Sequence, residues 1–126
     1  RHKAERPRHW QTIEEGRDLS GAIKMAISSS PQAIIVDCLT LWVSNLLLSQ
    51  TAEEGILDVA KGVASLAAGI KPQIVFVTNE VGAGIVPENG LARRFRDLAG
   101  MVNRIFAAQS QSVYMLVCGA PLKLSL

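Results

Sequence analysis

Three short runs of apolar residues, rich in β-branched side chains, stand out along the chain. They are residues Ala33–Asp37, residues 73–78 and residues Val113–Val117, and turn-forming residues flank each of them. None of the three alternates apolar with polar positions, which is typical of strands buried on both faces in a parallel sheet. We therefore expect three neighbouring, mainly parallel strands.

Segments with helical periodicity separate these strands. Within residues 18–29, 52–69 and 91–109, apolar residues recur three or four positions apart and would share one helix face. Gly69 and Pro72 are stop signals for the second segment. The order helix–strand–helix–helix–strand–helix–strand predicts a layered α/β domain with right-handed crossovers.

Composition narrows the class of protein. Hydrophobic residues make up 48% of the 126 positions and charged residues 19%, which suits one domain, residues 1–126, with a substantial core. No apolar run reaches the roughly 18–20 residues that a membrane-spanning helix needs, and the opening residues do not form a secretory signal. Cys38 and Cys118 are too few for a disulfide scaffold, so a cytoplasmic location is expected. The net charge of +2 argues against a nucleic-acid partner.

The start of the chain is unusual. Its first residue is Arg1 rather than Met, and the first seventeen residues hold five of the thirteen basic groups. A doubly wound sheet normally has more than three strands. We therefore expect a further portion upstream of Arg1.

Ligands in open α/β sheets bind at the carboxyl ends of the strands, so the residues that follow each strand are candidates. Asp37 closes the first apolar run, as does the Walker B acid that holds Mg²⁺ beside nucleotide phosphates. An Asp in this place is also a common helix N-cap. After the second run, Thr78 leads into a segment with Gly82 and Gly84 at alternate positions, which is either a tight loop or a binding loop. Asp37 and Thr78 should lie at the same edge of the sheet.

The N-terminal segment concentrates basic and aromatic side chains. These are His2, Lys3, Arg6, Arg8, His9 and Trp10. Guanidinium and ammonium groups bind phosphate oxygens, and a neutral imidazole nitrogen can attack phosphorus. The alternative is a solvated basic segment without a ligand.

Two further charged features have structural explanations as well. Thr12 and Glu15 have the spacing of a helix capping box, which favours a structural role for Glu15. A dense charged patch early in the last helical segment consists of Arg93, Arg94, Arg96 and Asp97. This patch is either a solvated helix face, or an anion site or subunit contact.

Together these pieces form long, ordered motifs. The first two are His2-Lys3-x-x-Arg6-Pro7-x-x-Trp10-x-Thr12-x-Glu14 and Asp37-Cys38-Leu39-Thr40-Leu41-Trp42-Val43-x-Asn45-Leu46-Leu47. The next two are Thr78-Asn79-Glu80-Val81-Gly82-x-Gly84-Ile85-Val86-Pro87 and Leu91-Ala92-Arg93-x-Phe95-Arg96-Asp97-x-x-Gly100-x-x-Asn103. From His2 to Lys123, the chain resembles the bifunctional adenosylcobinamide kinase / adenosylcobinamide-phosphate guanylyltransferase family of cobalamin biosynthesis.

The resemblance implies an α/β fold of the P-loop-containing nucleotide hydrolase type and two reactions. The family phosphorylates a hydroxyl of adenosylcobinamide with ATP or GTP. It then transfers GMP from GTP to that phosphate through a guanylylated histidine, giving adenosylcobinamide-GDP. Family members are homo-oligomers that act on small molecules, so a homo-oligomer without nucleic-acid or membrane partners is expected.

The resemblance also assigns roles to particular residues. By motif position, His2 matches the guanylylated histidine, because it directly precedes Lys3 and stands four residues before Arg6. His9 follows the proline of that motif and adjoins Trp10, so it is not expected to carry GMP. The residues that match the GTP site are Lys3, Ala4, Glu5, Arg6, Glu14 and Asp37, and Asp37 is also expected to hold Mg²⁺.

One family feature is absent from this sequence, which contains no G-x-x-x-x-G-K-[ST]. The resemblance implies that the family's opening strand, P-loop and first helix, with the strand after it, lie upstream of Arg1. The part that is present is therefore expected to expose apolar surface. Without a P-loop upstream of Arg1, the alternative is a non-catalytic assembly module of the same fold. A nucleic-acid-binding domain that rests on the basic N-terminus is a weaker alternative, since charges are balanced beyond residue 17.

Overall fold

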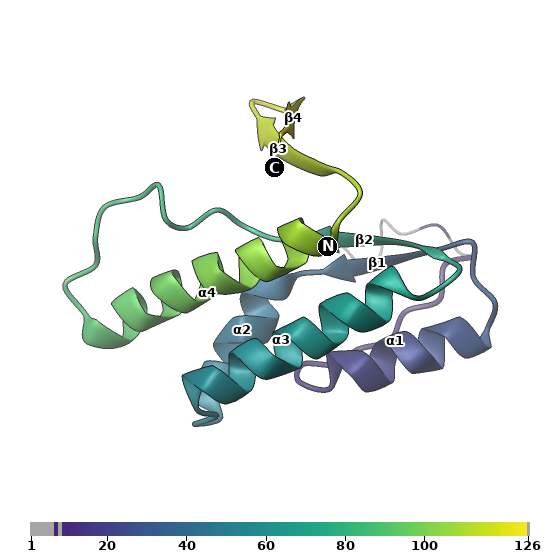
Figure 1. Ribbon diagram of the computed structural model, residues 1–126, viewed down its shortest axis with the longest axis horizontal. Helices are drawn as coiled ribbons and strands as arrows, with labels where there is room; N and C mark the ends of the chain where they lie inside the picture. Colours follow the sequence, from purple (N-terminus) through teal and green to yellow (C-terminus); the bar gives the residue numbers. More distant parts are fainter. Residues whose placement is uncertain (1–6, 8, 126) are drawn as a thin grey trace.

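The computed structural model describes residue 7 and residues 9–125, which form a mixed α/β fold. The elements follow the chain in this order: α1 Leu19–Ser28, β1 Ala33–Asp37, α2 Leu39–Leu48, α3 Glu53–Ala68, β2 Gln73–Val77, α4 Gly90–Gln109, β3 Val113–Val117 and β4 Ala120–Leu124. Figure 1 shows β1 and β2 side by side above α1 and α3, with β3 and β4 standing apart from them. The order of elements up to β3 agrees with the sequence-based prediction.

The first two predicted strands form a parallel pair. β1 and β2 are in register from Ala33 opposite Gln73 to Asp37 opposite Val77. The two helices α2 and α3 connect them, as a parallel pair requires, because the chain must return to the same end of the sheet. The prediction of neighbouring parallel strands is confirmed for these two runs.

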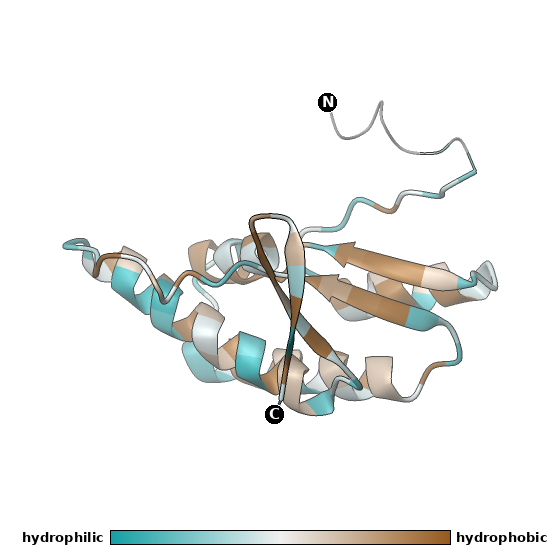
Figure 2. Ribbon diagram, turned by 90° about the horizontal axis from the view of Figure 1, so that it is seen from above, coloured by the Kyte–Doolittle hydropathy of each residue, from teal (hydrophilic) through white to brown (hydrophobic). Residues whose placement is uncertain are grey.

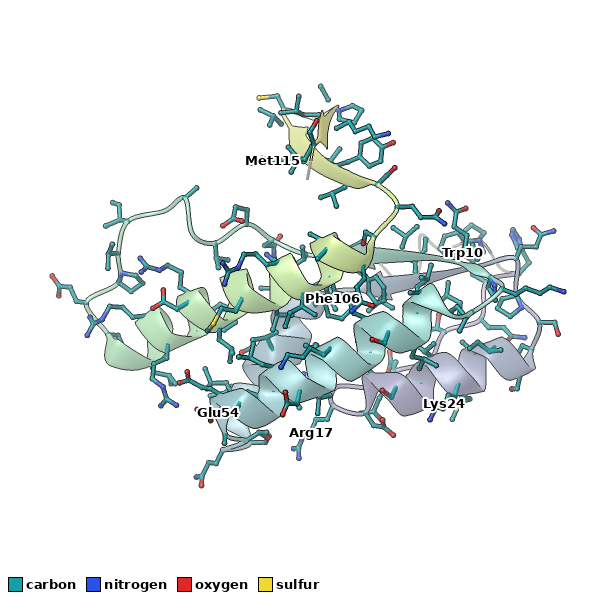
Figure 3. All side chains as sticks on the ribbon, viewed as in Figure 1. Trp10, Arg17, Lys24, Glu54, Phe106 and Met115 are labelled. Atoms are coloured by element: carbon teal, nitrogen blue, oxygen red, sulfur yellow. The ribbon has the colours of Figure 1, made fainter. Side chains whose placement is uncertain are left out.

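The helices and one face of this pair enclose the core. Leu39, Ile56, Val63, Leu98 and Val102 are at most 1% exposed and come from three different helices. From α4, Phe106 meets Phe76 of β2 with 4.6 Å between ring centroids and Trp42 of α2 with 6.4 Å. Figure 3 shows the Phe106 side chain beneath α4, on the side of α3 and the strands. Aromatic contacts therefore join the sheet to the helical layer.

The starts of α1 and α4 and the end of α3 match signals in the sequence. Asp18 accepts a hydrogen bond from the backbone N–H of Gly21 and caps α1, and Asn89 caps α4 in the same way through Ala92. Gly69 closes α3, as its place as a stop signal predicts. Across the described residues, no helix combines the length and the apolar character that crossing a membrane demands.

Within the described residues, the second face of β1 and β2 is left exposed. Exposure alternates along both strands, and Ile35, Val75 and Val77 are 49%, 44% and 40% exposed. The expectation that these strands are buried on both faces is therefore wrong for this structure, because helices cover one face alone. The expectation of exposed apolar surface is confirmed, and Figure 2 shows the two hydrophobic strands in full view from above.

The third apolar run does not join the parallel pair, so that prediction is wrong. β3 pairs with β4 in an antiparallel hairpin, and the turn between them is Cys118-Gly119. Both turn residues have positive φ, 51° and 80°, which is the backbone that a two-residue hairpin turn requires and that glycine adopts readily. The strand immediately following in the chain is thus the partner of β3, in place of the more distant β1 or β2.

Candidate functional site

The carboxyl ends of β1 and β2 meet at one edge of the sheet. Asp37 is the last residue of β1 and lies opposite Val77, so Thr78 follows directly beyond it on the neighbouring strand. The sequence-based prediction that Asp37 and Thr78 share an edge is confirmed. This edge is where ligands bind in parallel α/β sheets.

The Asp37 carboxylate is available to a ligand. Its side chain is exposed, and within the described part of the chain it accepts no hydrogen bond. The N-cap of α2 is Cys38, whose side chain makes no capping hydrogen bond, so the alternative explanation of Asp37 as a helix cap does not hold. Within the described residues, Asp37 therefore has neither a capping role nor an ion-pair partner.

A cluster of hydrogen-bonded side chains lies at the same edge. The Thr78 hydroxyl donates to Asn103 Oδ1 at 2.7 Å and lies 3.3 Å from the Thr40 hydroxyl. Thr40 Oγ1 also accepts the backbone N–H of Asn79 at 2.8 Å, and Asn103 Nδ2 donates to the Asn79 carbonyl at 3.2 Å. Three segments therefore meet here: the start of α2, the end of β2 and the middle of α4.

Sequence reasoning assigned no role to Thr40 or Asn103, although both stand in the motifs that carry the resemblance. Thr40 carries a usable signal, because it is a polar residue three positions after a strand end. Asn103 carries none, since it reaches the edge from α4, 25 residues after Thr78 in the chain.

Residues 79–89 form a long connection without regular structure between β2 and α4. At its beginning, the Gly82 N–H donates to Glu80 Oε1 at 2.7 Å. At its end, one Arg93 nitrogen donates to the carbonyls of Pro87 and Glu88 at 2.9 and 2.6 Å. Between these anchors, the Ile85 side chain is 97% exposed. The connection is thus fixed at both ends and open in the middle.

Glu14 and Glu15 lie in the extended segment before α1. Glu14, a predicted GTP-site residue, is exposed. Glu15 Oε1 accepts the backbone N–H groups of Arg17 and Asp18 at 2.7 and 3.0 Å, and these hydrogen bonds, that from Arg17 first, lower the pKa of the Glu15 carboxyl. The structural role predicted for Glu15 is confirmed, but the capping box with Thr12 is wrong, because no helix begins there.

Side chains of α2 hold Gly16 and Arg17, the two residues that follow Glu15. Trp42 Nε1 donates to the Arg17 carbonyl at 2.8 Å, and Asn45 Nδ2 donates to the Gly16 carbonyl at 3.1 Å. A hollow of about 350 Å³ lies beside this contact and is lined by Gly16, Arg17, Asn45, Leu48 and Ser49. It stands at the carboxyl end of α2, whereas Asp37 and Thr40 stand at its amino end. The hollow is therefore not the edge site.

Most of the basic N-terminal motif lies outside the described residues. This applies to the predicted site residues His2, Lys3, Ala4, Glu5 and Arg6. His9 and Trp10 are described and exposed, and the Trp10 N–H donates to the Pro7 carbonyl at 3.0 Å. Figure 3 shows Trp10 beyond the strands, at the opposite end of the molecule from the 79–89 connection.

The arginine patch at the start of α4 is used within the fold. Arg93 holds the preceding connection, Arg94 pairs with Glu53 of α3 at 2.7 Å, and Arg96 pairs with Asp97 at 3.0 Å. Each guanidinium therefore has an internal partner. The Arg93 and Arg94 contacts tie the beginning of α4 to the preceding connection and to α3, whereas the Arg96–Asp97 pair lies within α4.

The described residues contain no group of three or more His, Cys, Asp or Glu side chains that would cage a metal ion. Mg²⁺ does not need such a cage, because it keeps several waters and binds one or two carboxylates together with substrate phosphates. Asp37, exposed at the carboxyl edge with two threonine hydroxyls on the adjoining segments, fits that kind of ligand set.

Comparisons of this chain with known proteins all point to the same family. The model of the cobinamide kinase / cobinamide phosphate guanyltransferase family matches residues 1–124. The bifunctional adenosylcobalamin biosynthesis protein CobU of Escherichia coli (strain K12) is 35% identical over 98% of this chain and 74% of its own length.

Two further relatives agree. The protein of the same name from Salmonella typhimurium is 38% identical over the same shares, and the bifunctional adenosylcobalamin biosynthesis protein CobP of Pseudomonas aeruginosa is 36% identical over 98% of this chain and 70% of its own. A family match over nearly every residue and three relatives above 30% identity establish the relationship. The chain belongs to the cobinamide kinase / cobinamide phosphate guanyltransferase family of enzymes.

Proposed function

We propose that this protein catalyses both reactions for which its family is named. In the first, the hydroxyl oxygen of adenosylcobinamide forms a bond to the γ-phosphorus of ATP or GTP, the nucleoside diphosphate leaves, and the hydroxyl proton is released. In the second, GMP is transferred from GTP to the new phosphate, giving adenosylcobinamide-GDP and pyrophosphate. The observation that carries the proposal is the family match over residues 1–124.

The proposed fold is a single α/β domain, residues 1–126, of the P-loop-containing nucleotide hydrolase type. Two features support it. β1 and β2 are parallel and connected through helices, and an apolar strand ends in the exposed acid Asp37. In nucleotide hydrolases of this type, an acid at the end of such a strand serves the metal ion.

The second reaction proceeds in two displacements at His2. A neutral imidazole nitrogen bonds to the α-phosphorus of GTP and pyrophosphate departs. A phosphate oxygen of adenosylcobinamide phosphate then bonds to the same phosphorus, and the phosphorus–nitrogen bond breaks to regenerate the histidine. Lys3 and Arg6 favour the neutral imidazole and stabilise charge on the phosphate oxygens. Ala4, Glu5 and Glu14 complete the proposed GTP site.

Asp37 is the proposed ligand of Mg²⁺. Its carboxylate is exposed and unpaired within the described residues, and it lies at the edge where phosphates of a nucleotide would be placed. A Mg²⁺ ion held by Asp37 would supply positive charge to neutralise the phosphate oxygens.

The proposal includes a homo-oligomer in the cytoplasm. Exposed apolar side chains on the β3–β4 hairpin and on one face of β1 and β2 support self-association. The cysteines Cys38 and Cys118 are both free, in keeping with a reducing compartment.

Labelling with GTP tests the covalent step. The full-length protein is incubated with Mg²⁺ and GTP labelled at the α-phosphate, alongside the variants His2→Ala and His9→Ala. We expect the label to bind the unsubstituted protein and the His9→Ala variant and to be absent from His2→Ala. A phosphoramidate is labile to acid and stable to alkali, which distinguishes it from a serine or carboxylate adduct.

Comparison of the two variants shows which histidine carries the label. Full labelling of His2→Ala with loss in His9→Ala alone would overturn the choice of histidine. Labelling that survives in both would remove the histidine mechanism altogether. Circular dichroism of the two variants shows that loss of label does not reflect loss of fold.

A further inference from the structure

The cluster of Thr40, Thr78 and Asn103 joins three segments at the carboxyl edge through side-chain hydrogen bonds. The hydroxyl of Thr78 contacts both other side chains, at 2.7 Å to Asn103 Oδ1 and 3.3 Å to Thr40 Oγ1. Asn103 donates to the backbone carbonyl of Asn79, and Thr40 accepts from its backbone N–H. The cluster therefore fixes the first residue of the 79–89 connection from two directions.

The four hydrogen bonds of the cluster are all exposed to solvent. Thr78 and Asn79 are exposed, and Thr40 and Asn103 are half-buried. Hydrogen bonds between exposed groups contribute little to stability, because water competes for both partners. Four such bonds at one edge, beside an unpaired carboxylate, are better explained by a need for fixed geometry than by a need for stability.

The position of the cluster shows which geometry it fixes. Asp37 lies one strand away and pairs in register with Val77, so Thr78 is the residue immediately beyond it. Asn79 and Glu80 come next and enter the open connection, whose other end Arg93 anchors. The cluster thus sets where this connection leaves the sheet relative to Asp37.

We infer that Thr40, Thr78 and Asn103 are positioning residues for phosphoryl transfer, and that they act by holding Asn79 and Glu80 beside Asp37 at the carboxyl edge. This inference rests on the proposed function, since Asp37 is there the acid next to the transferred phosphate. In that step the acceptor oxygen bonds to the γ-phosphorus, the bond from that phosphorus to the bridging oxygen breaks, and the acceptor proton is released. Misplacing a group by about 1 Å in such a step costs on the order of 100-fold in rate.

Matched variants of the full-length protein test the inference. Thr78→Val removes the hydroxyl and keeps the shape, whereas Thr78→Ser keeps the hydroxyl. Asn103→Ala removes both amide contacts. Gln109→Ala is the control, because it removes an amide from the same helix whose contact, 3.5 Å to Ser65, lies away from the edge.

Steady-state kinetics with ATP and adenosylcobinamide give the first readout. We expect kcat to fall on the order of 10- to 100-fold in Thr78→Val and Asn103→Ala, with KM for ATP changed by less than about 3-fold. Thr78→Ser and Gln109→Ala should retain the rate of the unsubstituted protein. Unchanged kcat in Thr78→Val and Asn103→Ala, or a loss that only follows a lower melting temperature, would overturn the inference.

Hydrogen exchange of residues 78–89 on the same proteins gives a readout that does not depend on activity. Faster exchange in Thr78→Val and Asn103→Ala, and unchanged exchange in Gln109→Ala, is the expected result. If the unsubstituted protein transfers no phosphate, the proposed function fails, and the positioning role for that step fails with it, whatever the exchange shows. If it is active and exchange over this connection is the same in all four variants, the positioning role alone is wrong.

Discussion

Two carboxylates just before α1, those of Glu15 and Asp18, accept hydrogen bonds from backbone N–H groups. These hydrogen bonds fix the conformation of the turn that leads into α1. Glu15 accepts hydrogen bonds from Arg17 and Asp18, and Asp18 in turn accepts one from Gly21. Trp42 and Asn45 then fix the carbonyls of Arg17 and Gly16 to α2. Both the backbone N–H groups and the backbone carbonyls of this turn are therefore hydrogen-bonded to side chains.

Glu15→Gln tests the charge on this turn. The hydrogen bonds lower the pKa of Glu15 below its ordinary value of 4.5, so its contribution to stability is present above pH 4.5 and is lost as pH falls through the lowered pKa. We expect the unsubstituted protein to melt at a slightly higher temperature than Glu15→Gln at pH 7, and the difference to shrink as the pH is lowered from 7 toward 3, through the lowered pKa. Thermal melts across this range measure it.

Glu88→Gln is the control for that series. The Glu88 carboxylate is exposed and makes no hydrogen bond in the described part of the chain, so its replacement should leave the pH dependence unchanged. A difference between Glu15→Gln and the unsubstituted protein that stays constant from pH 7 to pH 3 would contradict the role of charge.

At the residue scale, the sequence predicts some of the edge site and misses the rest for a physical reason. Asp37 and Thr78 are recognisable because each follows an apolar run, and parallel strands bring such positions together. Asn103 is not recognisable, because its contact with Thr78 depends on how α4 packs over the sheet. Periodicity shows that α4 exists, but not which of its polar residues reaches the edge.

The helices are the elements whose sequences specify them most directly. Asp18 and Asn89 stand directly before α1 and α4 and accept hydrogen bonds from Gly21 and Ala92 at 2.9 and 3.1 Å. Such caps satisfy backbone N–H groups that the first helical turn leaves unpaired. Cap, apolar periodicity and stop signal are all local, so these helices could be predicted from the sequence.

Asn89→Ala tests how far α4 depends on its cap. Loss of the cap should lower the free energy of unfolding by about 1 kcal/mol, seen in urea titrations as a lower midpoint with unchanged slope. Asn89→Asp keeps an accepting oxygen and adds a charge that the helix N-terminus favours, so it should retain stability. Equal losses in both variants would show that the side-chain cap does not stabilise α4.

The strands depend on more distant partners, and here prediction fails in part. The partner of β1 is found because α2 and α3 return the chain to the same end of the sheet. The partner of β3 is missed because β4 contains Pro121 and Lys123, which are unusual in a buried strand. What decides the pairing is the Cys118-Gly119 turn, whose two positive φ angles bring β4 back onto β3.

At the scale of the whole molecule, apolar surface remains outside the core. One face of the β3–β4 hairpin consists of three cross-strand pairs: Val113 with Leu124, Met115 with Leu122, and Val117 with Ala120. Met115 and Leu122 are 41% and 55% exposed. In Figure 3, Met115 projects from a hairpin that stands clear of the helices. Two-stranded hairpins are at most marginally stable alone, so burial of this face against a partner would stabilise the hairpin.

Self-association through this face is the last prediction. Met115→Glu combined with Leu122→Lys replaces an apolar pair by opposite charges on facing residues, which keeps the cross-strand attraction while removing the apolar surface. Light scattering at micromolar concentration should show an oligomer for the unsubstituted protein, whose interface buries more than about 1,000 Å², and a shift toward one chain for the double variant. Met25→Glu, at a position that is 60% exposed on α1 and away from the hairpin, should leave the oligomer intact. A monodisperse monomer for the unsubstituted protein would contradict the oligomer, and an unchanged oligomer in the double variant would exclude the hairpin as its interface.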